Sequence, residues 1–277
     1  MENFAPYFAE MPTTHKLLWL FACLGTATLA ERLIPLRRHG YNWWRHFRTN
    51  AALLTSTMVI NALFTALVLM ASAIASSNNF GLLAWLDWPY WAEFLLALAI
   101  MDLFAQYTIH YLLHKVPLLW RFHKVHHSDT HVDATTGTRH HPVDYLTREV
   151  FSLTMVVLLG MPPEFYAMYR VITIFCTYFT HANIQLPSAL DRALSFVIVT
   201  PDAHKFHHHD EVPWTDRNYG NIFVFWDRLF GTFVYQSTDR IVFGVDTMDD
   251  SKSDDLGHQL VVPFQTPQLS AARKATA

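Results

Sequence analysis

Charged residues are scarce in this chain of 277 residues. Asp, Glu, Lys and Arg make up 16% of the chain, whereas an average soluble domain has about 25%. Hydrophobic residues make up 52%, so the composition predicts an integral membrane protein. The formal net charge of −3 leaves no large basic surface, which excludes nucleic acid as a partner. The 9 glycines and 13 prolines are too few for a disordered chain.

Cysteine is nearly absent. The 2 cysteines, Cys23 and Cys176, lie far apart in apolar stretches. They exclude a disulfide framework, a zinc finger and an iron–sulfur cluster held by cysteine. We expect both to be core residues.

Apolar runs long enough to enter a membrane are, by contrast, frequent. The sequence predicts three spans of about 20 to 25 residues, followed by a pair of shorter apolar runs around a Met-Pro-Pro-Glu turn. These runs cover 17–36, 49–75, 91–110, 149–160 and 164–180. We therefore predict an all-α integral membrane helical bundle with three to five membrane-embedded helices, in which residues 149–181 form a membrane hairpin.

The distribution of Lys and Arg predicts the orientation. Five arginines lie at the end of the first span and between it and the second, five basic residues lie within 111–148 and eight follow the hairpin, whereas 75–90 and 161–164 have none. Basic residues favour the cytosolic side of a membrane. We therefore expect the N-terminus outside and the regions after the third span and after the hairpin in the cytosol. The membrane would be a bacterial inner membrane or the endoplasmic reticulum.

Histidine is the residue type that indicates chemistry. Of 17 histidines, 13 fall between His110 and His209, all on the predicted cytosolic face. They include an HxxxH box and two HxxHH boxes, which we call the first, second and third boxes. Their members are His110 and His114, then His123, His126 and His127, then His204, His207 and His208. Neutral imidazole is a common ligand of iron, zinc and copper, and eight to ten imidazoles suit two ions.

The other histidines are weaker candidates for metal ligands. A single HxxxH pair could equally be structural, but three boxes on one membrane face favour a metal site. His141 is evenly balanced between a ligand and a structural residue. His15, His39, His46 and His258 are expected at the surface or at an interface, and His131, His140 and His209 beside the metal ligands or exposed. Asp102 and Asp144 are candidates to orient a ligand ring or to line the bundle.

The order of the boxes, with His181-Ala-Asn183 between the second and third, resembles the fatty acid hydroxylase and sterol desaturase superfamily of membrane-bound non-haem diiron enzymes. Supporting motifs include Leu119-Trp120-Arg121-Phe122, Thr200-Pro201-Asp202 and Asn218-Tyr219-Gly220-Asn221. The resemblance covers about 102–233. It implies two iron ions, which zinc could replace in purified protein, held by the eight box histidines and His181, and less surely by His141 or Asn183. The run Trp226–Thr232 is expected to be a packing element.

The resemblance also implies a reaction. Members hydroxylate or desaturate an unactivated C–H bond of a fatty acyl chain, a sterol or a related lipid, with dioxygen as co-substrate. On this basis residues 1–110 form an N-terminal transmembrane region, 111–233 the histidine-box catalytic region and 234–277 a C-terminal cytosolic tail. The alternatives are a di-zinc lipid hydrolase, which would usually recruit carboxylates, and a bis-histidine haem electron carrier, which would place its histidines within the membrane.

The sequence offers no source of electrons. It has no G-x-G-x-x-G turn for a nicotinamide or flavin. We therefore expect a separate electron donor, such as a ferredoxin, a cytochrome or a reductase, to dock on the cytosolic face. Positive charge for an acidic partner could come from Lys115, Lys124, Arg192 and Lys205.

Overall fold

The computed structural model describes residues 4–38, 40–236, 238 and 241–265. Over these residues the chain consists of helices and loops, with isolated β-bridges but no extended strand, so the prediction of an all-α protein is confirmed. The predicted boundaries of the first and last regions include residues outside this description. The α-helices are α1 (Ala5–Ala9), α2 (Thr13–Leu33), α3 (Trp43–Ser77), α4 (Tyr90–Asp102), α5 (Ile109–Lys115), α6 (Pro117–His127), α7 (Pro142–Leu159), α8 (Pro163–His181), α9 (Ser188–Leu194), α10 (Pro201–His207), α11 (Phe225–Leu229) and α12 (Leu256–Val261).

Two helical stretches are long and apolar enough to cross a membrane. The first, Trp43–Trp85, contains α3, and the second, Tyr90–Lys115, runs through α4 and α5. Between α4 and α5 the same helix passes through a π-helical segment, Leu103–Thr108. The predicted spans at 49–75 and 91–110 lie within these stretches. For α2, α7 and α8, a place in the membrane stays a prediction.

The predicted hairpin is formed by α7 and α8. Helix α7 ends at Gly160, whose φ of 62° is the left-handed conformation that glycine adopts without strain, and Pro163 begins α8. A Cβ atom on Gly81 would lie 2.2 Å from the backbone nitrogen of Gly160. Two glycines therefore allow the loop after α3 to contact the tip of the hairpin.

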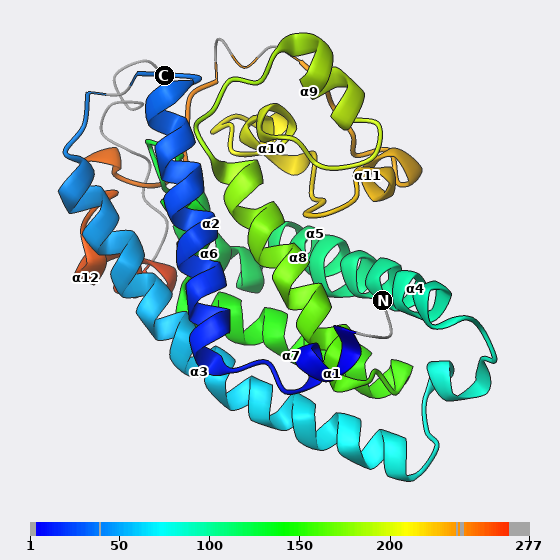
Figure 1. Ribbon diagram of the computed structural model, residues 1–277. Coiled ribbons are helices and arrows are strands. Elements are labelled where there is room, and N and C mark those ends of the chain that lie inside the picture. Colours follow the sequence, from blue (N-terminus) through cyan, green and yellow to red (C-terminus); the bar gives the residue numbers. More distant parts are fainter. Residues whose placement is uncertain (1–3, 39, 237, 239–240, 266–277) are drawn as a thin grey trace.

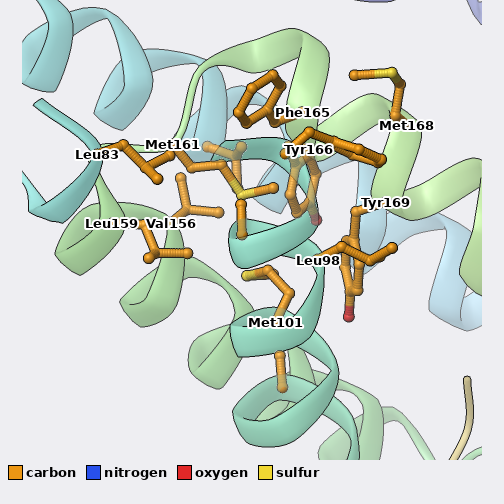
Figure 2. Close-up of a cluster of buried hydrophobic side chains, with 14 of the residues drawn as sticks. Leu83, Leu98, Met101, Val156, Leu159, Met161, Phe165, Tyr166, Met168 and Tyr169 are labelled. Carbon is orange, nitrogen blue, oxygen red and sulfur yellow. The ribbon is translucent and has the colours of Figure 1, made fainter. Parts of the chain in front are cut away.

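The main hydrophobic core joins the hairpin to the second candidate span. Figure 2 shows Leu98 and Met101 of α4 beside Val156 and Leu159 of α7 and Phe165 of α8. Phe165 also makes an edge-to-face contact with Phe94, with ring centroids 5.4 Å apart. Burial of these side chains fixes the hairpin against α4, and hence the histidines at its two ends against those of α5.

The shorter helices α9, α10 and α11 gather beyond one end of α8 (Figure 1). The expected tail does not extend freely over its described part, because α12 packs beside α3 and α6. Buried Arg139 connects this region to the second box: its guanidinium donates to the carbonyl oxygens of Val125 (2.9 Å) and Ser253 (2.5 Å). The C-terminal region therefore supports the loop that follows the second box.

Candidate metal centre

Nine histidines on or next to four helices form two adjoining groups. In each group, every residue offers one ring nitrogen within 4.8 Å of those of the others. Group one consists of His110, His114, His123, His127 and His207, and group two of His126, His181, His204 and His208. These are the eight box histidines and His181, which come from α5, α6, the end of α8 and α10.

Helical periodicity explains how the boxes are divided. His110 and His114 lie one turn apart on α5, and both belong to group one, as their spacing predicts. In the second box, the i and i+4 residues His123 and His127 enter group one, whereas His126 points to group two. In the third box, the i and i+4 residues His204 and His208 enter group two, whereas the i+3 residue His207 points to group one. Helices α6 and α10 therefore contribute to both groups.

The ring nitrogens lie at ligand spacing. The Nε2 atom of His110 is 3.1 Å from Nε2 of His123 and 3.1 Å from Nε2 of His207. In group two, Nε2 of His181 is 3.0 Å from Nε2 of His204 and 3.3 Å from Nε2 of His126. Two nitrogens bound to one ion at about 2.1 Å lie about 3 Å apart when the angle at the ion is near 90°. The spacing therefore fits imidazoles that converge on an ion.

Buried nitrogens without hydrogen-bond partners support the same conclusion. Neither ring nitrogen of His127 or His208 has one, nor does Nε2 of His114. An unsatisfied buried polar atom is costly, and these rings are at most slightly exposed. A metal ion in each group would satisfy one nitrogen of each of these rings, so the residues present fit a pair of ions.

Neighbouring groups fix the ring orientations. Nδ1 of His110 donates to the carbonyl oxygen of Tyr219 (2.8 Å), and Nδ1 of His181 donates to that of Thr177 (2.8 Å). Nδ1 of His207 likewise donates to the carbonyl oxygen of Arg217 (2.6 Å). Since Nδ1 carries the proton in these rings, Nε2 has its lone pair directed into the groups.

Asp144 supplies the carboxylate of the site. Its Oδ2 lies 2.8 Å from Nδ1 of His140 and 3.5 Å from Nδ1 of His123, and its Oδ1 accepts from Nε of Arg148 (3.2 Å). The pKa of Asp144 is well below its ordinary value because the neighbouring Arg148 and His123 outweigh the effect of burial. The expectation that Asp144 orients a ring beside the metal site therefore agrees with its position.

Burial controls the protonation of the site. It lowers the pKa of His123 to about 3, although the Asp144 carboxylate opposes this shift. Burial, and then the neighbouring imidazoles, hold the pKa values of His126, His127 and His208 well below the ordinary value. These rings are therefore neutral at pH 7, which is the form that binds a metal.

Comparison with known proteins agrees with this arrangement. The model of the fatty acid hydroxylase family matches residues 94–232, which contain all nine histidines. The chain belongs to the fatty acid hydroxylase family. It is 29% identical over 239 residues to ornithine lipid hydroxylase OlsE of Rhizobium tropici, which covers 82% of this chain and 70% of that protein. No solved structure matches the chain significantly.

Two further relatives align over shorter lengths. Alkylglycerol monooxygenase of Danio rerio is 27% identical over 158 residues, or 57% of this chain and 33% of that protein. The cholesterol 25-hydroxylase-like protein of Danio rerio is 31% identical over 134 residues, or 48% of this chain and 52% of that protein. These relatives are named as hydroxylases or monooxygenases, and this family member is an enzyme of the oxidoreductase class.

One predicted ligand lies elsewhere in this hydroxylase-family chain. His141 caps the N-terminus of α7, where its Nδ1 accepts from the backbone N–H of Val143 (3.1 Å), and its Nε2 donates to the carbonyl oxygen of Leu260 (3.3 Å). Both nitrogens are thus used in holding the helix, and His141 belongs to neither group. Asn183 is also turned away, because its side-chain amide pairs with the backbone of Arg37.

His140 agrees with the expectation and His46 does not, while His39 lies outside the described residues. His140 stacks on His126 with ring centroids 4.8 Å apart, so it lies beside group two, one of its two expected positions. His46 is 0% exposed, and its ring lies 3.5 Å from Asp129 and 3.0 Å from Asp254. No local pattern reveals this role for His46, because its partners follow 83 and 208 residues later.

The charges expected to receive an electron donor are partly hidden. Lys124 and Lys205 are 3% and 0% exposed, so the expectation that they offer surface charge is wrong. The ammonium group of Lys205 donates to the carbonyl oxygen of Ala182, and burial lowers its pKa to about 8. Lys115 and Arg192 are exposed, but Lys115 forms an ion pair with Asp216 (2.6 Å).

Proposed function

We propose that this enzyme hydroxylates an unactivated C–H bond of a membrane lipid with dioxygen, at a pair of iron ions. The observation that carries the proposal is the convergence of nine buried imidazoles, from both sides of the hairpin, into two adjoining groups. His110, His114, His123, His127 and His207 would hold one ion, and His126, His181, His204 and His208 the other. His141 is no longer among the proposed ligands.

The ligand chemistry distinguishes the proposal from its alternatives. Each group consists of imidazoles alone, whereas a di-zinc hydrolase usually includes a carboxylate ligand and an open position for water. A bis-histidine haem carrier would have one histidine on each side of a macrocycle, and the nitrogens here are 3.0–3.3 Å apart, too close for a ring between them. Reduced iron, when bound, supplies the activation of dioxygen that an apolar C–H bond requires.

The protein supplies a dry and rigid environment. His123, His127, His207 and His208 are at most 1% exposed, and carbonyl oxygens fix the Nδ1 protons of three rings in the site. Such burial keeps bulk water from the reacting centre and holds the ligands in one orientation. The carbon that reacts is chosen by how the lipid is held against this site.

Lipid hydroxylation is favoured because the relatives are named for it. Two of the names specify an ornithine lipid and an alkylglycerol, and the third likens its protein to a cholesterol hydroxylase. We propose a membrane lipid of this general kind, and we favour hydroxylation over desaturation. The metal site is proposed to lie at the cytosolic face, as the distribution of basic residues predicts.

A separate electron donor is part of the proposal. Each hydroxylation requires two electrons from outside, and over the described residues no flavin or nicotinamide fold is present. A ferredoxin, cytochrome or reductase would therefore dock on the cytosolic face. Since Lys124 and Lys205 are buried, their substitution is not expected to alter docking directly.

The test combines metal dependence with product analysis. Protein stripped of metal and reconstituted in lipid should form a product that gains one oxygen atom from labelled dioxygen. This should require iron, dioxygen and a reductase system, and zinc should not replace iron. Loss of two hydrogen atoms from the lipid would indicate desaturation. A hydrolytic product with zinc alone, or sustained oxidation without a reductase, would refute the proposal.

A further inference from the structure

The segment that follows the third box lies against the middle of the second candidate span. The carboxylate of Asp102 accepts hydrogen bonds from the backbone N–H groups of Ile222 (3.2 Å) and Phe223 (3.0 Å) and from the indole N–H of Trp226 (3.0 Å). Asp102 is 0% exposed. A buried carboxylate with three donors is a specific anchor, so the position of this segment along α4 is well determined.

A second contact fixes the same segment nearby. The rings of Tyr107 and Phe230 stack, with centroids 5.3 Å apart. Asp102 and Tyr107 precede Lys115, the last residue of the candidate span, by 13 and 8 residues. At 1.5 Å per helical residue, these contacts lie about 12–20 Å inside the end of the span. Residues 222–230 therefore lie beside the span at the depth of lipid.

The surface beside this contact is apolar. We define the apolar ridge as the exposed side chains of Phe196, Val197, Phe225, Leu229 and Phe230, whose exposed fractions are 64%, 57%, 37%, 69% and 55%. Its two stretches lie next to each other, because the backbone N–H of Val224 donates to the carbonyl oxygen of Val197 (3.1 Å). In Figure 1, α11 lies above the helix that runs through α4 and α5, and α9 lies higher still. A contiguous exposed set of this kind marks an interaction surface.

Arginines accompany the apolar ridge. The guanidinium of Arg228 lies 5.1 Å from the ring centroid of Phe196 and 4.0 Å from that of Phe233, and donates to the carbonyl oxygen of Ser195 (2.9 Å). Arg192 and Arg228 are both exposed. Arginine beside aromatic residues is typical of the membrane interface, where the aliphatic stem lies among acyl chains and the charged end reaches lipid phosphate.

We propose that the apolar ridge inserts into the lipid bilayer, so that the region after the third box is partly membrane-embedded. The partner is the acyl-chain region of the bilayer, where the Ser195 carbonyl oxygen and the rings of Phe196 and Phe233 accommodate the Arg228 guanidinium and Arg192 reaches towards the phosphates. The apolar ridge is anchored to the middle of a candidate span. This depth favours lipid over a protein as its partner. From the sequence, the region after the hairpin is expected in the cytosol, apart from apolar patches lying on the bilayer; this proposal identifies 196–230 as such a patch and places it deeper, among the acyl chains.

The insertion has a consequence for the metal centre. Tyr219, whose carbonyl oxygen holds Nδ1 of His110, lies three residues before Ile222 in the anchored segment. The segment that inserts in lipid is therefore the one that orients a proposed ligand. An acyl chain could reach the site without first passing through water.

Two matched positions test the insertion without relying on activity. Leu229 and Val212 are 69% and 68% exposed, but Val212 belongs to the turn whose Asp216 pairs with Lys115 at the end of the span. The full chain is prepared with Leu229→Cys or with Val212→Cys. Each variant is labelled with a nitroxide at the new cysteine and placed in nanodiscs of phosphatidylcholine and phosphatidylglycerol. The native Cys23 and Cys176 are each 8% exposed. Labelling of the unsubstituted protein shows how much nitroxide these two cysteines take up. Accessibility to dioxygen, which concentrates in lipid, is compared with accessibility to a water-soluble nickel chelate.

We expect the label at 229 to be more accessible to dioxygen than to the nickel chelate. The label at 212 should be more accessible to the nickel chelate than to dioxygen. Phe196→Cys, in the other stretch of the ridge, should resemble 229. Equal nickel accessibility at 229, 196 and 212 would overturn the proposal. Because the readout needs neither iron nor turnover, its failure is distinguishable from failure of the proposed function.

Discussion

Nδ1 of His110 donates a hydrogen bond of 2.8 Å to the carbonyl oxygen of Tyr219, which lies 109 residues later in the chain. The bond joins the first box, at the end of a candidate span, to the segment after the third box. It fixes both the orientation and the tautomer of the ring, so that Nε2 faces His123 and His207 at 3.1 Å. Proteins commonly orient metal-binding imidazoles in this way.

Substitution of a grouped histidine should lower metal content and activity together. His127→Ala removes an imidazole of group one and His204→Ala one of group two. Each variant should bind less iron and be at least about tenfold less active, measured by elemental analysis and lipid oxidation. His258→Ala is the control, because His258 belongs to neither group. Full metal content and full activity in His127→Ala would show that this ring is not a ligand.

Asp144→Asn should weaken metal binding without removing a proposed ligand. The carboxylate contacts His123, His140 and Arg148, and an amide has one oxygen acceptor in place of two and no negative charge to compensate the Arg148 cation. Loss of such a partner typically costs about 10–100-fold in metal affinity, which competition with a chelator measures. Asp249→Asn is the matched control, because Asp249 is exposed and distant in sequence from the boxes. Unchanged affinity in Asp144→Asn would mean that the carboxylate only anchors α7.

Arg170→Met should destabilise the hairpin. The guanidinium donates to Glu149 (3.0 Å) and to the hydroxyl of Tyr145 (2.9 Å), and the Glu149 side chain is 2% exposed. Removing one partner of a buried ion pair costs about 3–5 kcal/mol because the other charge remains buried. Denaturant unfolding in detergent should show this loss, with exposed Arg45→Met as the control.

A double substitution checks the reason for that loss. Glu149→Gln combined with Arg170→Met removes both charges and should recover much of the stability lost in Arg170→Met alone. If the double variant were as unstable as the sum of both single variants, the loss would come from packing rather than from an unpaired charge.

The metal-free protein should become less stable as the pH falls below the ordinary histidine value. Burial lowers the pKa values of His126, His127 and His208 in the folded state, whereas the unfolded chain titrates near 6.5. Between these values the unfolded state binds more protons, so acid favours unfolding. Each such imidazole should lower the free energy of unfolding by about 1.4 kcal/mol between pH 7.5 and 5.5. Denaturant unfolding of chelator-treated protein at both pH values measures the effect.

His127→Gln provides the comparison for that experiment, because it removes one of these imidazoles and keeps a polar side chain. The variant should lose less stability on acidification than the parent protein. Identical stability of the parent at pH 5.5 and 7.5 would contradict the burial argument, since it would require these rings to be protonated in the folded state.

Local periodicity predicted the parts of the site that depend on one helix. The spacing in the first box places His110 and His114 together, and the boxes supply eight of the nine grouped histidines. His141 was misjudged because Pro142 begins α7, so the residue before it becomes the helix cap. Pro142 was visible in the sequence as a signal of a helix start. With His141 used as the helix cap, His140 is the neighbouring residue that faces the site.

Other features depend on contacts between distant segments. The donors to Asp102 follow it by at least 120 residues, and the carboxylates around His46 lie in the second-box loop and near the C-terminus. The predicted span marks Asp102 as an interior residue but does not identify its donors, and nothing in the local sequence distinguishes His46 from a surface residue. The burial of Lys124 and Lys205 is likewise a product of tertiary packing, which charge counting does not detect.

The division of α6 and α10 between the two groups makes metal loading cooperative under the proposed function. An ion in group one orders both helices, and these helices also present His126, His204 and His208 to group two. The second ion then binds to ligands that are already ordered, and by linkage the loss of either ion weakens the other. One-ion protein should therefore be a minor species, and activity should rise sigmoidally as iron is added.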